Sequence, residues 1–142
     1  MGRKGILFVC IGNSCRSIMA EALARHYWKD LLNAFSAGVY PLGRITPYTL
    51  QVLRERNIPA DGLHSKGLAA VDFSRVDVVV DLAGFPAKEL VPDRFAGKVV
   101  KAYVLDPYGG TPDDFREALN TIDWMLRQKL EIWTGAKIVD TV

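Results

Sequence analysis

The sequence predicts an α/β fold: a single three-layer domain in which a four-stranded parallel sheet carries helices on both faces. Short apolar runs alternate along the chain with longer stretches whose apolar residues recur at helical spacing. This alternation is typical of parallel sheets with right-handed crossovers. The first apolar run ends at a Gly-containing turn that leads into a helix, which predicts a phosphate-binding loop after the first strand. Because 49% of the 142 residues are hydrophobic, the chain can form one core, and we assign residues 1–142 to one domain.

The first half of the chain contains two predicted strands and two predicted helices. Residues 4–10 are apolar on both faces, as in a strand at the centre of a parallel sheet. A helix is expected over 16–32, where alanines allow close packing on the sheet, and a strand over 34–39. A Thr-Pro pair, which favours a helix start, predicts the next helix over 46–57.

The second half continues the alternation. We predict a short helix over 65–73, and a buried strand over 76–82, where the sequence reads V-D-V-V-V-D-L. A weak helix over 87–90 and a strand over 98–105 follow. The last helix is expected over 111–133, because T-P-D-D provides a cap, a proline and an acidic first turn.

Composition excludes several classes of function. The formal net charge is only +2 and the basic residues are scattered, which argues against nucleic-acid binding. The chain has no apolar stretch near the ~18 residues of a membrane span, and its first apolar run is short for a signal peptide. We therefore expect a cytoplasmic protein without membrane contact. For the oligomeric state we expect a monomer, with a weak dimer as the alternative. Two cysteines, at 10 and 15, and two histidines are too few for a disulfide scaffold or a zinc site, so no metal or cofactor is expected.

The stretch C-I-G-N-S-C-R-S, residues 10–17, carries the strongest chemical signal. A strand that breaks at a glycine turn and re-enters as a helix directs backbone N–H groups into the turn, at the positive end of the helix dipole. This dipole and the guanidinium of Arg16 both favour the thiolate of Cys10, which we predict to be a nucleophile facing a tetrahedral oxyanion. The predicted phosphate-binding residues are Ile11, Gly12, Asn13, Ser14, Cys15, Arg16 and Ser17.

Each residue type in this stretch suits phosphate chemistry. The planar guanidinium of Arg16 can hold two phosphate oxygens at once. Ser17 can donate a hydrogen bond to the sulfur of Cys10, and Asn13 can order a loop backbone that requires positive φ. The alternative is a buried cysteine at a strand end beside a structural arginine.

A second candidate segment is D-P-Y-G at 106–109. A phosphate ester has a poor leaving group, so a carboxylic acid such as Asp106 is needed to protonate the departing oxygen. Tyr108 and Tyr40 are candidate aromatic walls of the cleft. Cys10, Asp81 and Asp106 all fall at the carboxyl ends of predicted strands, the edge where parallel sheets bind ligands. The alternative for 106–109 is a simple turn. For Asp81 we favour a structural role over a place in the lining of the cleft.

The segment V-C-I-G-N-S-C-R-S-I-M-A-E-A, together with the distant D-P-Y-G, closely resembles the low-molecular-weight protein tyrosine phosphatase family. Three further segments fall in matching places: S-A-G-V at 36–39, H-S-K at 64–66 and V-V-V-D at 78–81. The resemblance implies a four-stranded parallel sheet and a protein-tyrosine phosphatase that forms a cysteinyl-phosphate on Cys10. It also implies Arg16 as phosphate clamp and Asp106 as general acid. The implied partner is a phosphotyrosine protein or a small aryl phosphate.

The sequence departs from the family pattern at three places. Ile18 stands where proline is frequent. The stretch D-L-A-G-F at 81–85 replaces an acidic-x-x-Asn stretch, and Gly109 and Gly110 follow Tyr108 where relatives can carry a second tyrosine.

Two other functions and a redox role stay open. Ser14 in G-N-S-C-R-S resembles the loop of thioredoxin-linked arsenate reductases, but those enzymes use two extra cysteines after the third strand. The corresponding loop, near 82–90, contains no cysteine, so an arsenate reductase would need an external thiol. A phosphate-binding module without turnover is the other alternative. Cys15 either fills space or forms a protective disulfide with an oxidised Cys10.

Overall fold

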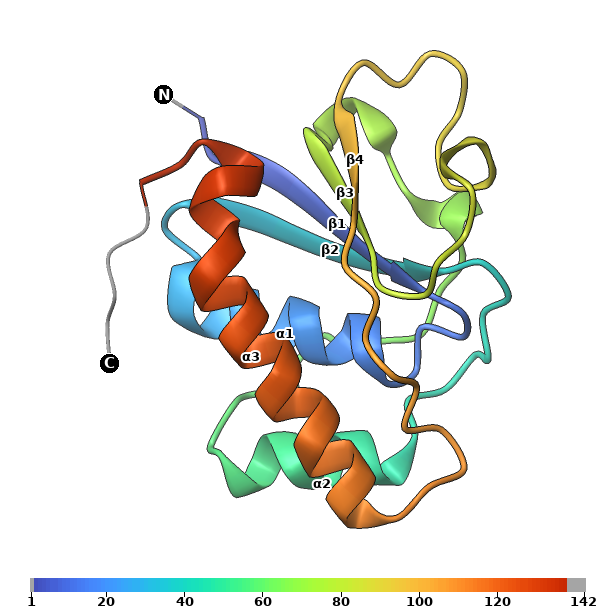
Figure 1. Cartoon of the computed structure of the whole chain (residues 1–142), viewed down its shortest axis with the longest axis vertical. Coiled ribbons are helices and arrows are strands. Elements are labelled where there is room, and N and C mark those ends of the chain that lie inside the picture. The colour runs from blue at the N-terminus through green and yellow to red at the C-terminus, as the bar shows by residue number, and fades with distance from the viewer. Residues whose placement is uncertain (1, 138–142) are drawn as a thin grey trace.

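A computed structural model describes residues 2–137. Its centre is a sheet of four parallel strands in the order β2-β1-β3-β4 (Figure 1). The strands are β1 (Lys4–Cys10), β2 (Leu32–Gly38), β3 (Val78–Asp81) and β4 (Lys98–Lys101). The predicted fold class is confirmed.

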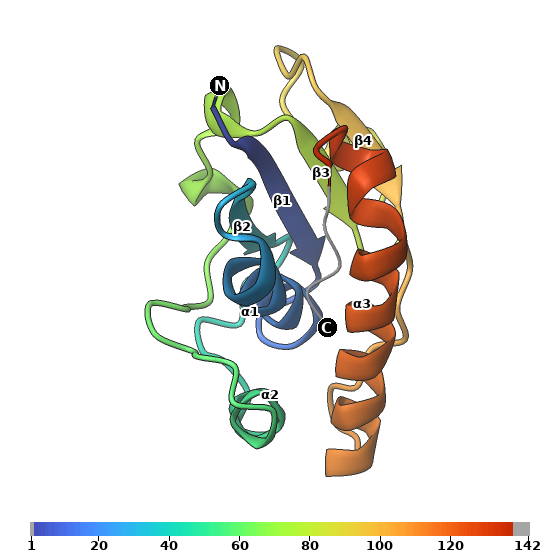
Figure 2. The ribbon, with the colours of Figure 1, turned by 90° about the vertical axis from the view of Figure 1, so that its left-hand side faces the viewer.

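Three α-helices lie on one side of this sheet: α1 (Arg16–Trp28), α2 (Pro47–Glu55) and α3 (Pro112–Thr134). Helices α1 and α3 cover the sheet, while α2 lies away from it at the far end of the molecule (Figures 1 and 2). The other face is covered by loops and three 3₁₀-helices, η1 (Leu68–Ala70), η2 (Phe73–Arg75) and η3 (Ala87–Glu89). Within residues 2–137 no helix is long and apolar enough to span a bilayer.

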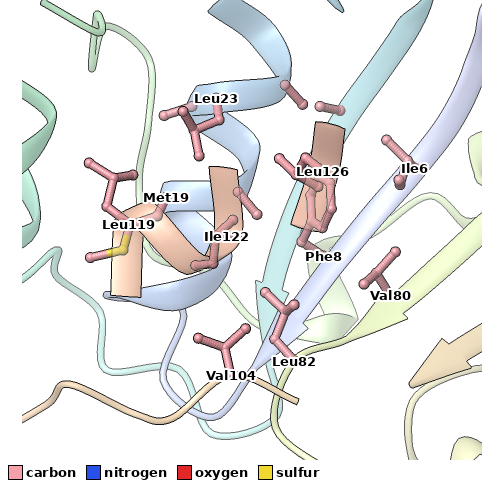
Figure 3. Packing of buried hydrophobic residues seen from close by; sticks show 14 of the residues in the cluster. Ile6, Phe8, Met19, Leu23, Val80, Leu82, Val104, Leu119, Ile122 and Leu126 are labelled. Carbon is pink, nitrogen blue, oxygen red and sulfur yellow. The ribbon is translucent and has the colours of Figure 1, made fainter. Parts of the chain in front are cut away.

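The alternation of side chains along β1 explains why its whole length is apolar. Ile6 and Phe8 pack toward the α-helices, whereas Leu7 and Val9 pack toward the 3₁₀-helices, and all four are fully buried. The helix residues packed with Ile6 and Phe8 include Met19, Leu23, Leu119, Ile122 and Leu126 (Figure 3). The central strand is thus fixed from both faces, and so is Cys10 at its carboxyl end.

Several predicted boundaries were wrong. The first helix ends at Trp28 rather than at 32, because the chain turns there and begins β2 at Leu32. The strand predicted over 98–105 ends at Lys101, where its pairing with β3 ends at Asp81. Beyond it, Ala102 N and Val104 N still donate to Asp81 O and Leu82 O, but these residues form no regular strand. The helix predicted over 65–73 consists of the short 3₁₀-helices η1 and η2, which are separated by two extended residues.

Candidate active site

The segment between β1 and α1 forms a tight loop that is held by the chain after β2. Asn13 has a φ of 49°, the positive value that we expected this loop to require. The end of β2 lies so close to the loop that a Cβ on Gly38 would be 2.7 Å from Asn13 N and from Ile11 O. Tyr40 N donates to Ile11 O at 2.8 Å. These contacts fix the loop, and the N-terminus of α1 beneath it has no side-chain cap.

Cys10 is buried at the base of this loop, with 2% of its surface exposed. Its Sγ lies 2.9 Å from Ser17 Oγ, and Asn13 Nδ2 donates to the same hydroxyl at 2.7 Å. The expected contact between Ser17 and the sulfur of Cys10 is present, whereas the bond from Asn13 to Ser17 was not predicted. Asn13 lies in the loop and Ser17 in the first turn of α1, and both residues are fully buried.

Arg16 is held by backbone carbonyls from two other segments. Its Nη1 donates to Leu82 O at 3.0 Å and to Val104 O at 2.8 Å. Its Nη2 lies 3.4 Å from Asp106 Oδ2. The Nε–H has no acceptor among the described residues although the side chain is 2% exposed. A buried donor without a partner is costly, so an anion that accepts from Nε would stabilise this site.

Asp106 reaches the same place from the segment after β4. Its Oδ1 accepts from Tyr108 N at 3.0 Å, which closes the turn of D-P-Y-G. The side chain is 36% exposed and pairs with Arg16 through its other oxygen. The carboxyl group is therefore ordered but open to a bound substrate.

These groups surround one pocket of about 190 Å³. Its lining comprises Cys10, Ile11, Gly12, Ser14, Cys15, Arg16, Tyr40, Leu42, Asp106 and Tyr108. The three predicted catalytic residues are thus brought together. Tyr40 and Tyr108, the predicted walls, are 68% and 55% exposed, and the ring of Tyr40 lies edge-on to Phe85. Leu42 was missed, because an isolated leucine in a loop gives no sequence signal.

Cys15 is a second thiol in the lining of the pocket. Its Sγ is 3.3 Å from Thr46 Oγ1, and burial raises its pKa above the usual value for a cysteine. Both cysteines are free in the structure. Cys15 is therefore protonated near neutral pH, which separates it chemically from a nucleophilic thiolate.

Asp81 does not line the pocket. It is fully buried, accepts from Ala83 N and Gly84 N at 2.9 Å each, and pairs with Lys101 Nζ at 2.9 Å. These bonds form the turn after β3, next to the Leu82 carbonyl that holds Arg16. This geometry favours the structural alternative for Asp81.

A polar cluster behind the loop was not predicted as part of the site. Glu21, Ser36 and Lys66 contact one another there, and Lys66 N donates to Asn13 Oδ1 at 2.8 Å. Ser36 and Lys66 lie in two of the family-like segments, and that was their only signal in the sequence. Within residues 2–137 no cluster of His, Cys, Asp or Glu side chains could hold a metal ion.

A strand–loop–helix segment with a cysteine at its base and an arginine at its edge is suited to bind a tetrahedral oxyanion next to a thiol. A family model described as low molecular weight phosphotyrosine protein phosphatase matches residues 5–137, and the chain belongs to this family. Phosphatase chemistry through a cysteine is the general activity that this membership supports.

The most similar proteins differ in what they act on. A protein-arginine-phosphatase of Bacillus subtilis is 33% identical, over 87% of this chain and 92% of the relative. An arsenate reductase of Bacillus cereus is 40% identical over 56% of this chain, and the match spans only 59% of that relative. A tyrosine phosphatase structure from Erwinia amylovora shares the fold with a TM-score of 0.80 at 19% identity, over 93% of this chain and 94% of that one.

Proposed function

We propose that this protein is a protein-tyrosine phosphatase that acts through a cysteinyl-phosphate on Cys10. The observation that carries the proposal is the pocket in which Cys10, Arg16 and Asp106 meet, with the Nε–H of Arg16 lacking an acceptor. A phosphoryl group is an anion that the Nε–H and the loop N–H groups can bind together. The cytoplasmic location and the monomeric state remain predictions.

The reaction follows from these positions in two steps. The thiolate of Cys10 attacks phosphorus, so that an S–P bond forms and the P–O bond to the leaving group breaks. Asp106 gives its proton to the leaving oxygen. Water then attacks phosphorus, its proton goes to Asp106, and the S–P bond breaks to restore the thiolate. Arg16 holds the phosphoryl oxygens throughout.

The walls of the pocket favour an aryl phosphate. Tyr40 and Tyr108 are exposed at its mouth, and Ile11 and Leu42 add apolar surface. A phenyl ring can stack on or between such side chains, in the edge-to-face or offset geometry that aromatic pairs prefer. This is the support for tyrosine as the substrate residue.

Phosphoarginine is the second candidate substrate. Ser14 belongs to the pocket lining, and the Bacillus subtilis relative is a protein-arginine-phosphatase. Ser14 can offer a hydrogen bond to a polar guanidino group that a phenol ring does not need. Arsenate reduction is disfavoured because Cys15 is the only thiol besides Cys10 in the sequence.

A substrate panel tests the proposal. We would measure kcat/KM of the purified protein on a phosphotyrosine peptide and on a phosphoarginine peptide of matched sequence. Arsenate-dependent oxidation of a small thiol is the third assay. We expect the phosphotyrosine peptide to react fastest, without consumption of thiol. The control is Cys10→Ser, which should abolish turnover but keep binding of inorganic phosphate, because a serine hydroxyl is not ionised near neutral pH.

Each other outcome selects a different function. Faster hydrolysis of phosphoarginine would assign the enzyme to that substrate, and robust thiol oxidation with negligible hydrolysis would make it a reductase. Phosphate binding without any turnover would indicate a binding module.

A further inference from the structure

A charged group behind the loop is not used by the reaction described above. Glu21, on α1, is 1% exposed, and its carboxylate forms ion pairs with Arg25 one turn along the helix and with Lys66 Nζ at 3.7 Å. From β2, Ser36 Oγ donates to Glu21 Oε1 at 2.5 Å. A buried carboxylate is costly unless it is paired and hydrogen-bonded in this way.

The contacts of Glu21 set the direction of the next hydrogen bonds. The single hydroxyl hydrogen of Ser36 goes to Glu21, so Ser36 Oγ can only accept from its other neighbours. Asn13 Nδ2 donates to Ser36 Oγ at 2.9 Å, and Lys66 Nζ donates to it at 3.3 Å. The Asn13 amide is fixed in this orientation because its Oδ1 accepts from Lys66 N at 2.8 Å.

The same series of hydrogen bonds continues to the nucleophile. The second Nδ2 hydrogen of Asn13 goes to Ser17 Oγ at 2.7 Å. Ser17 Oγ lies 2.9 Å from Cys10 Sγ, and its own hydrogen is free to point at the sulfur. Four hydrogen bonds, all between buried side chains, therefore connect Glu21 to Cys10.

We propose that Glu21 is a positioning residue for the nucleophile. By taking the hydrogen of Ser36 it leaves the Ser36 oxygen as an acceptor for Asn13. Asn13, held by this bond and by Lys66 N, donates its other hydrogen to Ser17 and so leaves the Ser17 hydrogen for the Cys10 thiolate. A neutral amide at position 21 can donate to Ser36 instead. The Ser36 hydrogen would then face the Asn13 N–H, donor against donor, and the order of the chain would be lost. The inference rests on the proposed role of Cys10.

The test measures the thiolate directly and does not depend on any substrate. We would follow alkylation of Cys10 by iodoacetamide as a function of pH, with tandem mass spectrometry to separate it from Cys15. We expect Glu21→Gln to move the pH of half-maximal alkylation upward by about one unit, which is ~10-fold slower reaction on the acid side. The acid limb of kcat/KM on an aryl phosphate should move with it.

A double-mutant cycle shows whether Glu21 acts through Ser36. Ser36→Ala should give a similar shift, and the double variant Glu21→Gln/Ser36→Ala should shift no further than Ser36→Ala alone. The matched control is Ile122→Val, a buried change in α3 that lowers stability but lies outside the series of hydrogen bonds from Glu21 to Cys10. Its alkylation profile should equal that of the wild type.

Three results would overturn the proposal: a Glu21→Gln profile like that of Ile122→Val, additive shifts in the cycle, or no shift in Ser36→Ala. The alkylation profile of Ser36→Ala can still overturn the proposal if Glu21→Gln does not fold. Because alkylation needs no turnover, a failure here is distinct from a failure of the substrate panel.

Discussion

Arg16 shows how one side chain joins segments that are far apart in sequence. It starts α1, yet its guanidinium is held by carbonyls at positions 82 and 104 and faces Asp106. A lysine has one ammonium group and no planar fork, so it could not keep these contacts and also present an Nε–H to a phosphate. Arg16 therefore sets the distance between the nucleophile loop and the acid.

The position of Asp106 gives a prediction about leaving groups. Asp106→Asn removes the proton donor but keeps a similar shape, so hydrolysis of alkyl or unactivated phenyl phosphates should slow by ~10²–10⁴-fold. Phosphates of acidic phenols should lose far less, because such phenols leave without protonation. A leaving-group series of kcat values measures this, and equal losses across the series would show that Asp106 is not the acid.

Cys15 should protect the nucleophile during oxidation. Burial raises the pKa of the Cys15 thiol, so a mild peroxide should oxidise Cys10 first, and its sulfenic acid could then condense with Cys15 in the same loop. We expect reversible inactivation in the wild type and irreversible loss in Cys15→Ser. Peptide mapping of the oxidised protein checks the link. If mapping finds no bond between residues 10 and 15, Cys15 is a packing residue.

At the scale of elements, the sequence predicts best where the signal is local. The apolar run of β1 and the loop at 10–17 lie in one continuous segment, so both the strand and the candidate nucleophile could be found. The length of β4 could not, because it depends on where its partner β3 ends. The carbonyls that hold Arg16 were also invisible, since any residue at 82 or 104 provides one.

The start of α3 gives a prediction at this scale. Thr111 Oγ1 accepts from Asp114 N, and the Asp114 carboxylate accepts from Thr111 N at 2.8 Å, a complete capping box. Thr111→Ala should lower the free energy of unfolding by about 1 kcal/mol, as measured by urea denaturation. The control is Thr121→Ala on the exposed surface of the same helix, which should change stability little. Equal effects of the two changes would contradict a role for the cap.

At the scale of the whole molecule, the carboxyl ends of three strands converge on one pocket. Cys10 closes β1, the Leu82 carbonyl follows β3, and Asp106 lies beyond β4. The edge of a parallel sheet thereby collects groups that the chain order separates by almost a hundred residues. Next to this edge, the start of α2 contacts the loop through Thr49 Oγ1, which donates to Ser14 O at 2.9 Å. Helix α2 is also joined to α3 by an ion pair between Glu55 and Arg116, whose oxygen and nitrogen are 2.7 Å apart.

That ion pair predicts how global stability depends on pH. Hydrogen bonding to Arg116, and secondarily to Gln51, lowers the pKa of Glu55 from 4.5 to about 2. Because the folded pKa lies below the unfolded one, the stabilisation is fully present above about pH 4.5 and is lost as the pH falls toward 2. The wild type should therefore have a higher Tm than Glu55→Gln at pH 6, and the gap should shrink toward zero near pH 2. The difference in Tm should be small, since the pair is exposed and screened by salt.

Glu117→Gln is the control, because Glu117 is exposed on α3 and makes no hydrogen bond or ion pair with the described residues. The Tm of Glu117→Gln should follow that of the wild type at every pH. A Tm difference between the wild type and Glu55→Gln that stays constant from pH 6 to pH 2 would show that the pair does not couple the two helices.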